Sequence, residues 1–138
     1  MRLINKNIYY AVRSLLYIAQ NPDKASSVSE LVSKLRMRRA FLRRILQVLS
    51  KHGILKSLKG KGGGFILSIS PSRLRLIDII RIFRGKINII SCLLEKDVCP
   101  HPDTCILMAQ MKDVEKRLYR TLKTTTIDIL LRGRKGKK

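Results

Sequence analysis

The chain has 138 residues, 45% of them hydrophobic and 5% aromatic, so it is long enough for one modest core and too short for two ordinary domains. Its formal net charge of +21 predicts a polyanionic partner. It shows no run of about 18 apolar residues, no signal-peptide cleavage pattern and no paired-carboxylate, nucleophile–base or Walker constellation. The sequence therefore predicts a cytoplasmic protein that neither enters a membrane nor acts as an enzyme.

Two helices are expected first. The first runs from about Asn5 to Gln20, where Asn21-Pro22 ends it. Its apolar side is formed by Ile8, Val12, Leu15, Leu16 and Ala19. The second begins at Ser27-Val28-Ser29-Glu30, a capping box, and its buried residues are Leu31, Val32 and Leu35.

The stretch from Leu31 to Ile77 contains twelve Lys or Arg and no Asp or Glu. A field of one sign concentrates an oppositely charged partner, whereas solubility needs only mixed charges. Within it lies a third helix with one apolar stripe, made of Phe41, Leu42, Ile45, Leu46, Val48 and Leu49. The other side of that helix is basic, as a DNA recognition helix requires.

A β-hairpin follows the stop at Gly53. Its expected strands are Ile54 to Leu58 and Phe65 to Ile69, joined by a basic, glycine-rich tip. A helix followed by such a hairpin predicts a winged helix-turn-helix. The candidate base readers are Arg39, Arg43, Arg44 and Gln47, since Arg and Gln match base edges in the major groove. The candidate phosphate and wing contacts are Ser27, Arg36, Arg38, Lys56, Lys59 and Lys61.

A fourth helix, defined by Leu76, Ile79, Ile80 and Phe83, is expected to end at Gly85. The pattern then becomes irregular from Lys86 to Asp103. Cys92, Cys99 and Cys105 all fall within fourteen positions at this point of the chain. Such clustering indicates a shared ligand, and the absence of a secretion signal favours reduced thiols over disulfides.

A long helix is expected from about Thr104. Its apolar residues recur at the spacing of a coiled-coil seam: Leu107, Met111, Val114, Leu118 and Thr121 or Leu122. This narrow stripe favours a partner helix. A short element from Ile127 to Leu131 follows, and Arg132 to Lys138 is expected to be a disordered basic tail.

With these motifs placed, the chain resembles the bacterial winged-helix regulators typified by the iron–sulfur cluster regulator and the nitric-oxide-sensitive repressor. The resemblance extends from Met1 to about Leu131. It rests on four motifs and the three cysteines. The motifs are Met1-Arg2-Leu3, the wing Lys59-Gly60-Lys61-Gly62-Gly63-Gly64-Phe65, Asp78-Ile79-Ile80 with Gly85, and the C-terminal Thr-rich segment Thr124-Thr125-Thr126. It implies a homodimer with crossing long helices and a [2Fe–2S] or [4Fe–4S] cluster bound by those cysteines.

A cluster with three cysteine ligands needs a fourth. Branches of the family use a His three residues after the third cysteine or an Asp near the partner's N-terminus, and this chain has Met108 and Ile8 at those places. His101 is the first substitute, followed by Asp97, Asp103 and Glu95. The wing of the family usually begins with Arg, and here it begins with Lys59.

Other interpretations remain open. Cys92, Cys99, Cys105 and His101 also form a zinc set by residue type. The cysteines are alternatively a thiol redox switch or plain core residues. A basic protein that binds RNA or anionic lipid without sequence preference is a further possibility.

The preferred fold is mainly α with a small β-hairpin. It consists of a winged helix-turn-helix domain (1–85), a cysteine-containing cluster loop (86–105), a dimerisation helix with a short terminal helix (106–131) and the basic tail (132–138), as one compact unit. The preferred function is a homodimeric transcriptional regulator that binds double-stranded DNA at a pseudo-palindromic operator.

Overall fold

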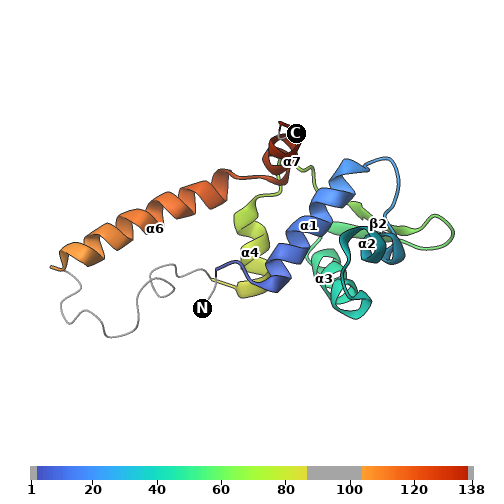
Figure 1. The fold of residues 1–138 in the computed structure, drawn as a ribbon, viewed down its shortest axis with the longest axis horizontal. Helices are drawn as coiled ribbons and strands as arrows, with labels where there is room; N and C mark the ends of the chain where they lie inside the picture. The colour runs from blue at the N-terminus through green and yellow to red at the C-terminus, as the bar shows by residue number, and fades with distance from the viewer. Residues whose placement is uncertain (1–2, 87–103, 137–138) are drawn as a thin grey trace.

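A computed structural model of the chain describes residues 3–86 and 104–136. Its elements are α1 (Lys6–Gln20), α2 (Val28–Leu35), α3 (Arg39–Lys51), β1 (Leu55–Leu58), β2 (Gly64–Leu67), α4 (Leu76–Arg84), α6 (Ile106–Thr124) and α7 (Ile127–Gly136). The predicted class, mainly α with one two-stranded hairpin, is confirmed. Figure 1 shows α1, α2, α3 and the hairpin gathered in one body, with the orange α6 extending away from it.

Helix α1 is central to the core and contacts α2, α3, α4, α7 and β2. Asn5 caps it, because its Oδ1 accepts a hydrogen bond from the Ile8 amide at 3.0 Å. The buried face is shifted slightly from the predicted one. Its buried residues are Ile8, Ala11, Ser14, Leu15 and Ile18, whereas Val12, Leu16 and Ala19 are half-buried. Ser14 is tolerated there because its hydroxyl donates to the Tyr10 carbonyl at 2.8 Å.

Helices α2 and α3 form the helix-turn-helix. Ser27 Oγ accepts from the Glu30 amide at 3.0 Å, which is the Ser half of the predicted capping box. The turn after α2 begins at Arg36, whose backbone is left-handed (φ 54°, ψ 49°). Helix α3 buries Leu42, Ile45, Leu46 and Leu49. Phe41 and Val48 lie at the edges of this stripe and are only half-buried.

The hairpin pairs β1 with β2 in antiparallel register, with Leu58 opposite Gly64 and Leu55 opposite Leu67. Two backbone hydrogen bonds attach β2 to the segment before α2. The Phe65 amide donates to the Ser26 carbonyl at 2.8 Å, and the Ser26 amide donates to the Phe65 carbonyl at 3.0 Å. Gly64 (φ 146°) permits this approach, because a Cβ there would overlap the Ser26 carbonyl. The wing is therefore held in place against the helix-turn-helix.

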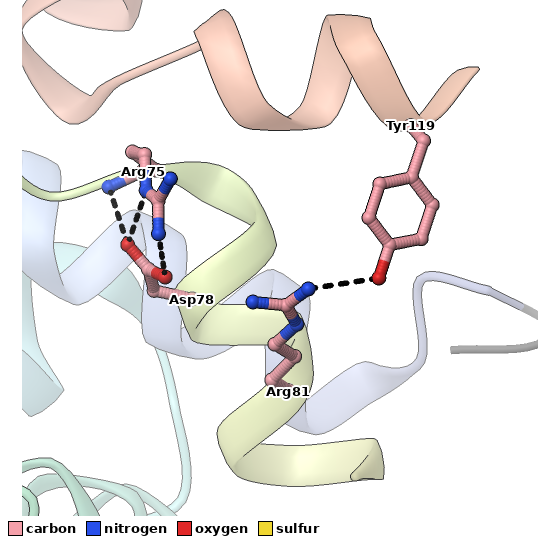
Figure 2. Close-up of polar contacts among 4 residues, drawn as sticks. All are labelled: Arg75, Asp78, Arg81 and Tyr119. Carbon is pink, nitrogen blue, oxygen red and sulfur yellow. Dashed lines mark hydrogen bonds and ion pairs between the residues drawn. The ribbon is translucent and has the colours of Figure 1, made fainter. Parts of the chain in front are cut away.

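Helix α4 joins the body to α6. The Arg75 guanidinium binds both carboxylate oxygens of Asp78, at 3.0 and 2.9 Å, which closes the first turn (Figure 2). The hydrogen bond and charge of Asp78 raise the pKa of Arg75. One turn further along, Arg81 donates to the Tyr119 hydroxyl of α6 at 2.8 Å (Figure 2). Gly85 (φ 78°) ends α4 as predicted.

Helix α6 is attached to the body mainly at its C-terminal end. Of its 19 residues only Leu122 is buried. Backbone hydrogen bonds secure the junction with α7: the Leu76 amide donates to Thr125 at 2.8 Å, and the Ile127 amide donates to Leu74 at 2.9 Å. The first half of α6 projects from the body (Figure 1).

The prediction of a disordered tail from Arg132 is wrong as far as Gly136, because α7 continues as a helix to that residue. An Asp128–Arg132 ion pair at 2.9 Å spans one helical turn, and Leu130 and Leu131 pack against the core. These contacts extend the helix beyond Leu131. In the ranges that the structure describes, no helix is long and apolar enough to cross a membrane.

Candidate nucleic-acid interface

The cations of the acid-free stretch face solvent. Of the twelve Lys and Arg between Leu31 and Ile77, eleven are exposed and Arg75 is half-buried. Among residues 3–86 and 104–136, Arg75 is also the one member of this set with an ion pair. The positive field around α3 and the hairpin is therefore not neutralised by the described part of the chain.

A groove of about 740 Å³ lies beside α3, on the side of the wing, and we call it the reading groove. It is lined by Val28, Arg39, Arg43, Gln47, Ser50, Lys51, Ser57 and Phe65. Arg39 is oriented by a hydrogen bond from its Nη2 to Ser29 Oγ at 2.9 Å. Guanidinium groups donate, whereas the Gln amide and the Ser hydroxyls donate and accept. This mixture matches the donor and acceptor pattern of base edges.

The wing extends the basic surface beyond α3. Lys56, Lys59 and Lys61 are all exposed. A hydrogen bond from the Gly63 amide to the Gly60 carbonyl at 3.0 Å closes the tip. The tip glycines carry no side chains, so the backbone there can approach a phosphate closely.

A second groove, which we call the α1–α3 groove, has a volume of about 450 Å³. It is lined by Lys6, Tyr10, Arg36, Arg38, Ala40, Phe41 and Arg44. Arg44 was grouped with the base readers on sequence, but it lies in this groove and not in the reading groove. Lys6 and Tyr10 were missed. Their spacing of four residues places both on one side of α1, and this spacing is the signal that marks them.

Ser27 has a structural task in addition to its predicted phosphate contact. Its oxygen accepts the capping bond from Glu30, and the residue is half-buried. A hydroxyl keeps its hydrogen when its oxygen accepts, so Ser27 can still donate to a phosphate.

Most of the predicted metal ligands fall outside the described residues. These are Cys92, Cys99 and His101, together with Asp97, Asp103 and Glu95. Cys105 is half-buried and occupies the N-cap position of α6. Within 3–86 and 104–136, no three His, Cys, Asp or Glu residues gather as a metal site. The ligand set therefore stays a prediction.

Comparison with known proteins identifies the family. The Rrf2 family model, described as an iron-dependent transcriptional regulator, matches residues 4–133. Protein aau3 of Rhizobium meliloti is 31% identical over 135 residues, which cover 97% of this chain and 87% of that protein. The HTH-type transcriptional regulator NsrR of Halalkalibacterium halodurans is 26% identical over 124 residues, covering 88% of this chain and 85% of NsrR.

The fold agrees with a solved structure of the same kind. T. potens IscR superposes with a TM-score of 0.76 at 21% identity, covering 98% of this chain and 90% of that one. The resemblance inferred from the sequence motifs is thereby confirmed. The chain belongs to the Rrf2 family, and it is a DNA-binding transcriptional regulator and not an enzyme.

Proposed function

We propose that this regulator is a homodimer that binds a pseudo-palindromic operator and senses iron–sulfur status, redox state or nitric oxide through a cluster held by Cys92, Cys99 and Cys105. The observation that carries the DNA-binding part is the reading groove, where exposed cations without ion pairs adjoin a glycine-tipped wing. The description of the family as iron-dependent supports a metal-linked signal.

In this proposal α3 enters the major groove. Arg39, Arg43 and Gln47 contact base edges, because they stand one turn apart on the side of α3 that faces the reading groove. Lys59 and Lys61 at the wing tip reach the adjacent backbone and minor groove, where Lys acts as a point charge without base preference. Ser27, Arg36, Arg38 and Lys56 bind phosphates.

The apolar stripe of α6 supports the homodimer. Leu107 and Val114 are 54% and 40% exposed, and Ile106 at the start of the helix is 82% exposed. Met111 and Leu118 continue the stripe and are half-buried. A helix of a monomer rarely presents such a row to water, and the spacing is that of a coiled-coil seam. A second copy of α6 is the occupant that this pattern fits.

The donor chemistry of the cysteines fits an iron–sulfur cluster, since cysteine thiolates are the usual protein ligands of such clusters. When bound, the cluster would supply a group that reacts with oxidants and nitric oxide. His101 is proposed as the fourth ligand. Within the described residues, α6 provides the connection to DNA binding: Cys105 precedes its first turn, and Tyr119 near its other end bonds to Arg81 of α4.

Selection of duplexes from a random-sequence pool with the purified full chain tests the DNA-binding proposal. The expected result is a two-fold related consensus with half-sites about one helical turn apart. Recovery of no preferred sequence, with equal binding to every duplex, would favour the sequence-independent basic protein instead.

Purification without oxygen tests the cluster. The wild type should be coloured and contain iron and sulfide. Cys99→Ala should lose the iron and the sulfide, and His101→Ala should lose part of each. His52→Ala is the matched control, because His52 lies at the end of α3 and its Nδ1 is 2.9 Å from the Val48 carbonyl oxygen. If the wild type is colourless and carries zinc, the zinc interpretation replaces the cluster. If it carries no metal, the cysteines are free thiols.

A further inference from the structure

The α1–α3 groove collects cations from three separate parts of the chain. Lys6 comes from the first turn of α1, Arg36 and Arg38 from the turn before α3, and Arg44 from α3 itself. None of the four forms an ion pair within residues 3–86 and 104–136, and no acidic residue lines the groove. Like charges held together repel unless an anion lies between them, so the groove favours an anionic occupant.

The chemistry of this groove differs from that of the reading groove. Its charged side chains only donate hydrogen bonds, and Tyr10 contributes the one side-chain hydroxyl. Phosphodiester oxygens only accept, whereas base edges both donate and accept. A groove whose charged side chains only donate hydrogen bonds therefore fits the DNA backbone better than the bases.

Lys6 is held in position before any ligand arrives. Its Nζ lies 5.6 Å from the centre of the Tyr10 ring and 5.5 Å from that of Phe41. The two rings support each other in an edge-to-face contact, with centroids 5.4 Å apart. A cation restrained in this way loses less conformational entropy on binding.

We propose that the α1–α3 groove is a second DNA contact, which binds backbone phosphates on the side of α3 away from the wing, and that Arg44 belongs to this contact and not to base reading. The inference rests on the proposed insertion of α3 into the major groove. A helix of about 10–12 Å diameter fills a groove about 12 Å wide, so both of its flanks face a sugar–phosphate strand. The wing covers one flank, and the α1–α3 groove covers the other.

Binding of the full chain to two labelled duplexes tests the assignment, one duplex carrying the selected operator and the other a scrambled sequence. Lys6→Ala and Arg44→Ala should each weaken binding to both duplexes by the same factor, about tenfold per protomer. Each should also make the binding constant less dependent on salt. The slope of its logarithm against the logarithm of salt concentration should become smaller in magnitude by about 0.9 per lost phosphate contact. Lys6→Arg should restore binding, since it keeps the charge.

Lys112→Ala is the matched control, because it removes the same charge from an exposed position of α6 that lines neither groove. Melting followed by circular dichroism confirms that each variant folds. If wild type binds neither duplex, the proposed function fails and this inference with it. If wild type binds and the Lys6 and Arg44 variants behave like Lys112→Ala, or if Arg44→Ala weakens only operator binding, the groove assignment alone is overturned.

Discussion

Arg43 and Arg44 are neighbours in sequence with different surroundings. Arg43 lines the reading groove together with Gln47, whereas Arg44 lines the α1–α3 groove together with Lys6. The cause is helical geometry, since consecutive residues of a helix point about 100° apart. A side chain's role at this interface therefore depends on its angle around α3, and charge alone does not define it.

Replacing Arg43 or Lys59 separates base reading from backbone binding. Arg43→Ala should reduce operator binding by about 1–3 kcal/mol and leave scrambled DNA almost unaffected, because a bidentate base contact is lost. Lys59→Ala should weaken binding to both duplexes to the same extent. Fluorescence anisotropy with the two duplexes measures both effects, and identical behaviour of the two variants would contradict the division of roles.

Arg36 is the one non-glycine residue with positive φ among those that the structure describes, at 54°. This conformation costs an L-residue about 1–2 kcal/mol, and glycine adopts it without strain. Arg36→Gly should therefore leave the free energy of unfolding unchanged or raise it by up to about 1 kcal/mol. The same substitution should weaken DNA binding. Stability and binding that fall together would show that the side chain supports the fold.

At the level of elements, the helix boundaries followed from local signals. Asn5, Ser27 and Gly85 mark ends that the sequence predicted, because a cap is made by residues close in the chain. The full length of α7 was not predictable in this way, since it depends on Leu130 and Leu131 meeting a core formed by distant residues. The hairpin was expected from its glycines, but its attachment to Ser26 needed the tertiary structure.

Gly64→Ala should displace the wing. The added Cβ would overlap the Ser26 carbonyl and disturb the two hydrogen bonds between Ser26 and Phe65, at an expected cost of about 2–3 kcal/mol. Gly62→Ala is the matched control, because Gly62 also has positive φ (75°) but has nothing within 4 Å of the added Cβ. Denaturant melts compare the two. An equal loss in both variants would mean that the contact with Ser26 does not position the wing.

Val114→Glu should separate the proposed homodimer, because a charge in the proposed seam between two copies of α6 would be buried without a partner. Ala109→Glu introduces the same charge at an exposed position on another side of α6 and should leave the dimer intact. Light scattering coupled to gel filtration gives the masses. A dimer that survives Val114→Glu would place the subunit interface elsewhere.

Over the whole molecule, the first and the last of the described helices lie against each other. Helix α7 contacts α1, Ile127 is completely buried, and Leu122 is 5% exposed. The N-terminal winged-helix region is therefore completed by residues from the last part of the sequence. The sequence shows that Leu122 and Ile127 are apolar, but whether they meet a partner chain or their own core depends on contacts with residues far away in the chain, such as Leu74 beside Ile127.

Ile127→Ala tests this closure. Removing a fully buried Ile should cost about 2–5 kcal/mol of unfolding free energy and lower the stability of α1 and α4 together with α7 in one transition. Ile129→Ala, two residues further along and 49% exposed, should cost much less. Amide hydrogen exchange measures the protection of each helix separately. Loss of protection confined to the amides of α7 would show that α7 unfolds independently of α1 and α4.

The position of Ile127 also bears on when the chain can fold during its synthesis. Domains generally fold as units during translation, and here the unit lacks a central side chain until nearly all 138 residues have emerged. A nascent chain truncated after the wing has the basic surface but not the finished core. The winged-helix region and α7 therefore reach their stable form together, once the chain has been made beyond Ile127.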